Sequence, residues 1–548
     1  MPYVARAPLL IHGIILFALS QHRRTSFEKL PVQKCFVISN GSAVSSIIPV
    51  LANAKNTNDK IRVSYIHIQA NIAQERFDVA VNNSLAILEE LGVEFSTTDE
   101  MTMKAELAKT QSLLETRAGG GASLLQSILS KSTSSDSRHI GLMRILCCAS
   151  RAAYVAKPPL MLFIVLRTVQ MVIGDSVITA ESSHAFANLS FVMSGLGNHS
   201  IARDSAKIAL ALLERFDQKY SNTVICLLNM SSLPYHQPVQ ACIEALRQGY
   251  KGAAAVGDRD WARISINQIS HMSIMAPERG RTLDDVEESI RLVLAGFSSQ
   301  EEGPKNLLVL SVLYLQLVLN LKGEANSVVG TEDPTVITGS AMNQEEYLRM
   351  CEEKGVRDYF RRFYCCRFYL AYLFHQHRLA EEMVGKCNEL SRLARFCPSF
   401  QVITETFYMG LVAAAALQRL NRADSTSEIS RWQQLANNSL TLLTKWADEG
   451  SDWNFLHKAD LLHAEIAVAT GDSDTALLSY QSAIIGAKKS GFVNEEALSC
   501  ERAGLYLAQQ GEIEEGRIYL RRAEMLYNMW GAHRKGQDVS SLIREHCS

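Results

Sequence analysis

The residues with the richest chemical potential lie between Arg357 and Phe374, in the run RDYFRRFYCCRFYLAYLF. Arginines beside aromatic rings can hold the phosphates of an RNA strand and stack on its bases. The aromatic residues recur at intervals of three and four, however, which is the spacing of one buried helix face. We therefore interpret the run as a core helix with the arginines along the edges of its buried face. A site for a partner and a site for RNA are the alternatives.

Other residues with chemical potential lack the partners that a reaction needs. His375 and His377 have no third metal ligand within reach by spacing. The adjacent carboxylates of Asp448 and Glu449 could do acid-base work, but nothing distinguishes them from ordinary solvated charge at a helix end. No G-x-x-x-x-G-K-[ST] phosphate loop, kinase motif set or G-x-S-x-G motif is present. The sequence therefore predicts no catalytic residue, no cofactor and no metal site, and we expect a protein that is not an enzyme.

Composition narrows the possible partners and the compartment. The 548 residues carry a net charge of -2 with acidic and basic residues interspersed, which argues against nucleic acid as a partner. The 12 cysteines are scattered without a C-x-x-C motif, as expected for free thiols in the cytoplasm. The apolar run from Ala7 to Ser20 is too short for stable membrane insertion. It is either the core of a targeting signal or a core helix.

The elements that would position these residues are helical repeats, most clearly between Lys458 and Trp530. Small residues and one large residue recur there at the same offsets, with a shift of 40 residues. This is the tetratricopeptide (TPR) pattern, in which small residues let two helices approach closely. We predict an all-α fold, a TPR-like α-solenoid of antiparallel helix pairs. The predicted repeat-packing residues are Gly471, Ala476, Tyr480 and Ala483 in the first copy and Gly504, Gly511 and Ala523 in the second.

The same pattern suggests how the chain is organised. Residues 1–43 match no repeat, and residues 44–321 form a first TPR-like block. Residues 322–342 are rich in Gly, Asn, Thr and Asp and lack a period, so we expect an exposed insertion loop. Residues 343–548 form a second block, whose first helix is predicted over 345–374.

The end of the chain resembles a known family. The segment GFVNEEALSCERAGLYLAQQGEIEEGRIYLRRAEMLYNMWGAHRK, Gly491 to Lys535, is similar to the TPR-like region of multidomain STAND/AAA-ATPase signalling kinases. Further similar segments are Ile61–Phe95, Ile208–Phe216 and Asp358–Phe374, so the resemblance covers about residues 45 to 540. In that family a serine/threonine kinase-like domain and an ATPase precede the repeats, and GAF and histidine-kinase domains often follow.

The resemblance implies a non-catalytic interaction or sensing module that binds a protein or peptide in its concave groove. The family's ATPase and kinase domains are missing from this chain. We therefore expect an incomplete product of a longer gene, in which these domains would be intramolecular partners; a stand-alone remnant is the alternative. A generic TPR adaptor in complex assembly is a further hypothesis, and a secreted protein is the weakest one.

Overall fold

The computed structural model describes residues 57–95, 99–118, 123–218, 220–298, 309–324, 333–354, 357–393, 399–420 and 426–547. These residues are helical except for connecting segments and one pair of two-residue parallel strands, β1 (Ser132–Thr133) and β2 (Val177–Ile178). The prediction of an all-α fold is confirmed. The predicted segment 1–43, with its apolar run, lies outside the described residues.

The chain divides into two compact units. Unit 1 comprises the residues up to Leu228 together with Gln248–Ala262, and unit 2 comprises Asn229–Arg247 and Arg263–Ser548. The borders between the units therefore fall between residues 228 and 263, whereas the sequence suggested a division at 322–342. The difference arises because Asn229–Arg247 packs with helices that follow much later in the chain.

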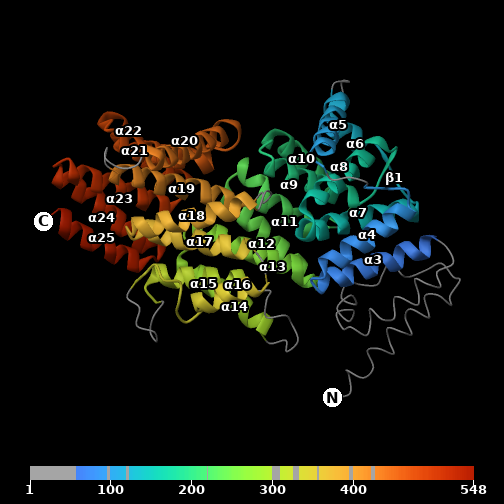
Figure 1. The fold of residues 1–548 in the computed structure, drawn as a ribbon, viewed down its shortest axis with the longest axis horizontal. Coiled ribbons are helices and arrows are strands. Elements are labelled where there is room, and N and C mark those ends of the chain that lie inside the picture. Colours follow the sequence, from blue (N-terminus) through green and yellow to red (C-terminus); the bar gives the residue numbers. More distant parts are fainter. Residues whose placement is uncertain are drawn as a thin grey trace, which may run out of the picture. The chain divides into compact units, whose positions relative to one another are not determined.

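Unit 1 is built around helix α9, in which every residue from Glu181 to Ser194 is buried. Helices α3, α4 and α7 pack against one another, and α8 packs on both α7 and α9 (Figure 1). The helices of this unit are α3 (Thr57–Ala73), α4 (Phe77–Glu90), α5 (Glu100–Ala118), α6 (Leu124–Leu129), α7 (Ser137–Ala156), α8 (Pro158–Gly174), α9 (Glu181–Gly195) and α10 (His199–Arg215). Helices α11 (Ser221–Ser231), α12 (Val239–Ala255) and α13 (Arg259–Met275) contain residues of both units.

Local sequence signals set several helix ends in unit 1. Gly92 follows α4 with a φ of +83°, and Pro158 occupies the first turn of α8. The segment 131–137 before α7 contains the exposed strand β1. The Lys131 ammonium in this loop donates to three backbone carbonyls at the end of α8, at 2.6–2.8 Å. The loop is thus held against the end of α8.

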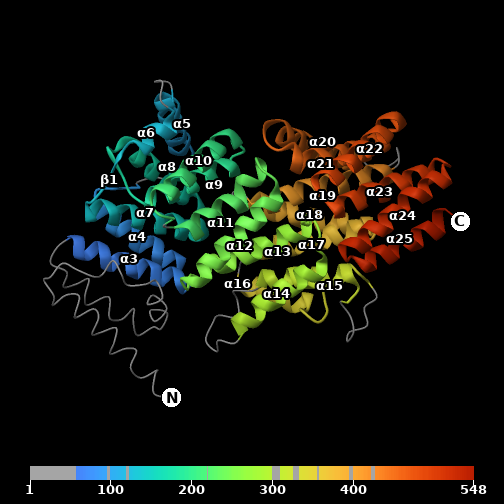
Figure 2. The same ribbon diagram turned by 180° about the vertical axis from the view of Figure 1, so that it is seen from behind.

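Unit 2 contains the remaining helices, and α17, α18 and α19 lie side by side in it (Figures 1 and 2). The predicted helix over 345–374 is two helices, α16 and α17, and residues 355–356 between them lie outside the described part. The elements are the 3-10 turn η3 (Leu233–Tyr235), α14 (Leu283–Ser298), α15 (Val309–Lys322), α16 (Gln344–Lys354), α17 (Arg357–Leu373), α18 (His377–Leu393), α19 (Phe400–Arg419), α20 (Thr426–Glu449), α21 (Asp452–Thr470), α22 (Ser473–Ser490), α23 (Val493–Gln509), α24 (Ile513–Trp530) and α25 (His533–His546).

The segment 322–342, expected to be exposed, is partly buried. Thr335 and Ile337 have no exposed surface. The side-chain amide of Asn320 on α15 donates to the carbonyls of Pro334 (2.9 Å) and Val336 (2.8 Å) and so holds the segment against the helix. The expectation is therefore wrong for Thr335 and Ile337. The polar composition of the segment suggested that its backbone carbonyls bind water, but two of them accept hydrogen bonds from the buried Asn320.

Helix α19 is the one helix among the described residues that is long and apolar enough to cross a membrane. In the structure, 83% of its apolar window is buried inside the protein. Its Glu405 is also buried and forms an ion pair with Arg361 on α17. Core helices that do not cross a membrane can be equally long and apolar, and they are buried inside the protein in the same way.

The predicted repeat-packing residues occupy helix ends and helix contacts in unit 2. Gly471 follows α21 with a φ of +79°, and Gly511 follows α23 with a φ of +90°. The others lie where α21 packs on α22 and α23 packs on α24: Ala476, Tyr480, Ala483 and Ala523 are buried, and Gly504 lies against Leu520. A Cβ atom on Gly504 would lie 2.8 Å from Leu520 Cγ and 2.9 Å from the Gly516 carbonyl oxygen.

We predict that Gly504→Ala destabilises unit 2 by roughly 1–3 kcal/mol, because the added methyl group meets backbone that has no room to move. The matched control is Gly385→Ala on α18, where a Cβ atom would meet only the Arg431 guanidinium at 3.8 Å. This control should stabilise the helix by up to about 1 kcal/mol. Urea unfolding of both variants measures the difference, and equal stabilities would contradict the close approach of α23 and α24.

Candidate functional site

Three turns in unit 2 lie next to segments that precede them by 212 to 248 residues. Each turn contains a glycine, and each lies directly before one of the helices α21, α23 and α25. A Cβ atom on the first glycine, Gly450, would lie 2.1 Å from the carbonyl oxygen of Tyr235, so no other residue fits there without movement. The glycines and their neighbours are Gly450 with Tyr235, Gly491 with Arg279, and Gly531 with Leu283.

Asn454, in the first turn of α21, binds the backbone of one of these loops. Its side-chain amide donates to the carbonyl oxygens of Pro234 and Gln237, each at 2.7 Å. Its side-chain oxygen accepts a hydrogen bond from the backbone N–H of Val239 at 3.1 Å. All three contacts are with main-chain groups, so Asn454 recognises the shape of the segment rather than its side chains.

The same loop places one aromatic side chain in a buried position. Tyr235 lies edge-on to Trp446 with ring centroids 5.2 Å apart, and stacks on Phe455 at 5.8 Å. Beside it, the indole N–H of Trp453 donates to Gln240 at 3.2 Å. The side chain of Tyr235 thus adds residue-specific contacts to the main-chain contacts of Asn454.

A second asparagine, 40 residues later, makes one comparable main-chain contact. Asn494, in the first turn of α23, donates to the carbonyl oxygen of Met275 at 3.1 Å. The guanidinium of Arg279 in the same loop donates to the carbonyl oxygen of Lys489 at 3.3 Å. We call Asn454 and Asn494, with the loops 234–239 and 275–279 that they contact, the backbone seam.

Buried charges lie next to the backbone seam on α21 and α23. The Glu495 carboxylate accepts from the Lys458 ammonium at 2.5 Å and from His457 Nε2 at 2.6 Å, and all three side chains are buried. The ammonium also lies 4.1 Å from the centre of the Phe492 ring. Burial and the charge of Lys458 lower the pKa of His457 to about 4, so this histidine is neutral and donates its Nε2–H.

A second cluster repeats the Lys, Glu and His combination around Glu501 on α23. Its carboxylate accepts from Lys535 and from His375 Nε2, each at 2.8 Å. Lys535 has no exposed surface and also donates to Asp538 at 2.7 Å. Burial alone would raise the pKa of Glu501, but Lys535 and the hydrogen bond from His375 outweigh it and lower the pKa to about 2.

The third buried carboxylate, Glu465 on α21, is shared by three other helices. It accepts from Arg502 at 2.8 and 3.0 Å, from the Tyr480 hydroxyl at 2.7 Å and from the Gln418 amide at 3.0 Å. Tyr480 was expected only to fill space between two helices. Its hydroxyl also completes the coordination of a buried charge, which spacing alone did not indicate.

The run from Arg357 to Phe374 is a core helix, as expected, but its arginines are not where the sequence placed them. Arg361 and Arg362 are buried rather than at the edges. Arg361 Nη2 binds Glu405 at 2.5 Å, and Arg362 Nη1 donates to the Tyr314 hydroxyl at 3.0 Å. Both arginines therefore have buried partners on other helices, which makes burial of their charge possible.

The other candidate groups gain no catalytic geometry. His375 is bound to Glu501, and no set of three His, Cys, Asp or Glu side chains that could hold a metal ion occurs within the described ranges. Asp448 and Glu449 are exposed at the end of α20.

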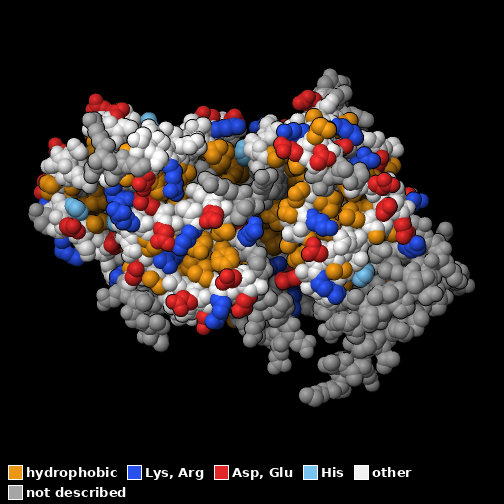
Figure 3. Space-filling view, viewed as in Figure 1, with side chains coloured by type: hydrophobic (Ala, Val, Ile, Leu, Met, Phe, Trp, Pro, Cys, Tyr) orange, Lys and Arg blue, Asp and Glu red, His pale blue; other side chains and the backbone are white. Residues whose placement is uncertain are grey.

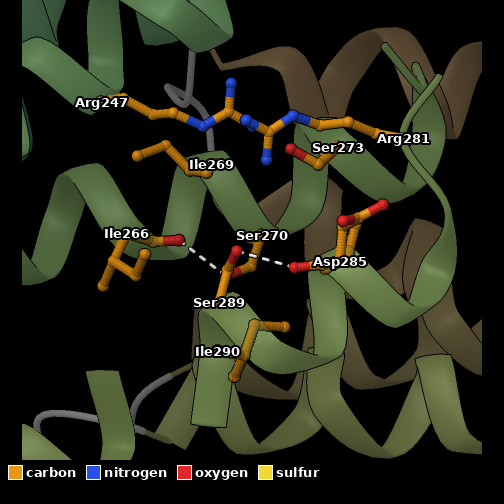
Figure 4. Close-up of a pocket in the computed structure, with 10 residues that line it drawn as sticks. Arg247, Ile266, Ile269, Ser270, Ser273, Arg281, Asp285, Ser289 and Ile290 are labelled. Atoms are coloured by element: carbon orange, nitrogen blue, oxygen red, sulfur yellow. Dashed lines mark hydrogen bonds between the residues drawn. The ribbon is translucent and has the colours of Figure 1, made fainter. Parts of the chain in front are cut away.

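A small pocket with both apolar and polar side chains in its lining lies between α12, α13 and α14 (Figure 4). Arg247 and Arg281 extend over Ser273 at its mouth, and Asp285 and Ser289 line its other side. The Arg247 guanidinium is already bound by the Glu278 carboxylate, with Nη1 and Oε1 2.6 Å apart. The positive charge that would attract an anion to this pocket is therefore largely neutralised.

No protein-family model matches the chain, and a search of curated proteins found no match. The residues of the backbone seam were not found by sequence reasoning, although the 40-residue spacing of Asn454 and Asn494 is visible in the sequence. The helices α21 and α23 are mostly buried against other parts of unit 2. Their contacts with the neighbouring helices α19, α20, α22 and α24 contribute to this burial.

We predict that Asn454→Ala lowers the free energy of unfolding of unit 2 by about 1–3 kcal/mol, because two buried carbonyl groups and one N–H group lose their partner. The control is Asn438→Ala, an exposed residue of α20, which should change stability by less than about 0.5 kcal/mol. Chemical unfolding measures both values. If Asn454→Ala leaves the free energy of unfolding unchanged, these hydrogen bonds make no net contribution to stability.

The buried neutral state of His457 predicts a pH dependence of stability. Its pKa is about 4 in the folded protein and about 6.5 when unfolded. As the pH falls from 6.5 to 4, the unfolded chain takes up a proton that the folded chain does not, so stability is full above pH 6.5 and decreases below it. The loss for this one group between pH 7 and 5 is about 1–2 kcal/mol.

Urea unfolding at pH 7 and pH 5 tests this dependence. His457→Gln should reduce the difference between the two pH values, even if it lowers stability at both. The matched control is the exposed His533→Gln variant, which should keep the difference of the parent chain. If His457→Gln leaves the difference unchanged, His457 does not contribute to it.

Proposed function

We propose that this chain is a non-catalytic protein-interaction module, a TPR-type α-solenoid of antiparallel helix pairs, that binds an irregular peptide segment through its backbone. The observation that supports this proposal is the recurrence of Asn454 and Asn494 at equivalent positions of successive helix pairs, each donating to main-chain carbonyls. An asparagine amide can donate to a main-chain carbonyl and accept from a main-chain N–H, so it is suited to binding the backbone of a peptide.

In this mechanism the chain's own loops occupy the groove until a partner replaces them. Leu233–Val239 is then an intramolecular ligand. Its Pro234 carbonyl accepts a hydrogen bond from Asn454, and its Tyr235 ring stacks on Phe455. A partner segment with a proline followed by an aromatic residue would make the same contacts. Because the resident segment is covalently attached, its effective concentration at the site is high. Only a partner that binds tightly can therefore displace it.

The resemblance to signalling ATPases and kinases adds the biological setting to this proposal. The module would hold a regulator in the cytoplasm and transmit its presence to ATPase and kinase domains of a longer gene product. The exchange of a resident loop for a partner supplies a physical signal, because it changes the contacts of α12 within unit 2.

A fluorescent peptide with the sequence of residues 231–239, SSLPYHQPV, tests the groove in the full chain. Tyr235→Leu weakens the resident segment while keeping an apolar side chain. We expect the peptide to bind this variant at least about tenfold more tightly than the parent chain, because its competitor is weakened. Fluorescence anisotropy measures the affinity.

Two further variants show whether the proposed residues hold the peptide. Adding Asn454→Ala to Tyr235→Leu should abolish the gain in affinity, whereas adding the exposed Asn438→Ala should preserve it. Circular dichroism confirms that each variant is folded. If the peptide binds the Tyr235→Leu chain no better than the parent, the backbone seam serves only to hold unit 2 together.

A further inference from the structure

Five large apolar side chains are exposed on helices α22 and α24, namely Met529 and four residues that recur in the repeat. Leu478 and Ile485 lie seven residues apart on α22, with 67% and 68% of their surface exposed. Ile518 and Met525 lie seven residues apart on α24, with 68% and 53% exposed. A spacing of seven keeps each pair on one helix face. We call these four residues the outer stripe, and Figure 3 shows apolar side chains between charged ones on the surface of the C-terminal helices.

The outer stripe recurs in register with the 40-residue repeat. Leu478 corresponds to Ile518, and Ile485 corresponds to Met525. Both helices pack on α23 through their opposite faces, so the stripe is not needed for that contact. Exposed apolar residues that recur at equivalent positions indicate a binding surface rather than scattered surface residues.

Charged residues extend each half of the stripe in a definite order. On α22, the exposed residues run from Asp474 through Leu478, Gln481 and Ile485 to Lys488. On α24, the exposed residues at the same positions run from Glu514 through Ile518, Arg521 and Met525 to Asn528. Each helix therefore carries an acidic group at its beginning, and α22 carries a basic group at its end.

This order makes the surface complementary to itself when two copies meet with α22 antiparallel to α24. Counted along the helices, Leu478 then faces the second copy's Met525, and Ile485 faces the second copy's Ile518. Lys488 faces the second copy's Glu514, an exposed carboxylate that in the single chain forms an ion pair with the half-buried Arg517. A twofold axis repeats every one of these contacts, so all four apolar residues of both copies are covered.

The alternative self-pairings are less favourable. Placing α24 antiparallel to α24 would put the exposed Arg521 against its own copy, and two like charges directly opposite repel. Placing α22 antiparallel to α22 would leave Ile518 and Met525 without a defined partner. The pairing of α22 with α24 covers the whole stripe without opposing like charges.

We propose that the outer stripe is a homodimer interface in which α22 of one copy pairs antiparallel with α24 of a second copy. This interface lies on the face of α22 and α24 away from α23, and it does not depend on peptide binding at the backbone seam. The peptide experiment and the experiment below therefore succeed or fail independently.

Sedimentation velocity of the full chain over a range of concentrations tests the proposal. We expect a mass of twice 60.8 kDa at high concentration. Ile518→Glu should weaken the dimer at least about tenfold, because it places a charge in the apolar centre of the interface on both sides of the axis. The matched control is Leu292→Glu on α14, an equally exposed leucine outside the stripe, which should leave the dimer unchanged.

A charge exchange tests the antiparallel register. Lys488→Glu and Glu514→Lys should each weaken the dimer about two- to tenfold, and the chain carrying both changes should regain the affinity of the parent. A chain that stays monomeric at all concentrations overturns the proposal, as does a dimer that Ile518→Glu leaves intact. Capture of a different helical protein by the stripe of a monomeric chain would also overturn it, because the occupant would not be a second copy.

Discussion

Unit 2 depends on the requirement that each buried carboxylate must lie beside a cation. Glu465, Glu495 and Glu501 lie on the buried helices α21 and α23, and an unpaired charge there would cost several kcal/mol. Their cations come from α21, α23 and α25, so the three helices are tied in one register. A shift of any one of them by a turn would separate a carboxylate from its cation. Apolar packing alone, which tolerates such shifts more easily, would fix the arrangement less strictly.

The backbone seam complements these charges with neutral hydrogen bonds. Asn454 and Asn494 lie at the helix starts, where α21 and α23 approach earlier loops. Glu495 follows Asn494 directly, whereas Glu465 and Glu501 lie farther along the same helices. Charged contacts thus connect the C-terminal helices with one another, and neutral contacts connect them with loops of other helices. The close approach that both need is possible because glycine occupies the turns, most clearly at Gly450.

The sequence predicted what depends on local pattern. The small residues 40 apart identified the helix contacts of α21 to α24, and the spacing of the aromatic residues identified α17 as a core helix. It did not predict the partners of buried polar groups. Arg361 meets Glu405, 44 residues away, and no local periodicity relates the two positions. For the same reason the polar segment at 333–337 resembled a surface loop, although the buried Asn320 holds its backbone.

The candidate site was still harder to predict. Asparagine at the start of a helix normally suggests a cap for that helix. Asn454 instead binds backbone groups 215 to 220 residues earlier, a relation that only the folded chain reveals. The spacing between Asn454 and Asn494 was present in the sequence, but nothing in it distinguished these two residues from other polar residues of the repeats.

The separation between Tyr235 and its binding site has a consequence during synthesis of the chain. The residues that cover Tyr235 follow it by more than two hundred positions, since the contact of Asn454 with Pro234 spans 220 residues. At typical rates of translation this delay is roughly 10 to 45 seconds. During that time an apolar segment in the middle of the nascent chain stays uncovered, while helices of unit 1 can already pack. During this interval a chaperone can bind the tyrosine before the C-terminal helices of the chain are available to cover it.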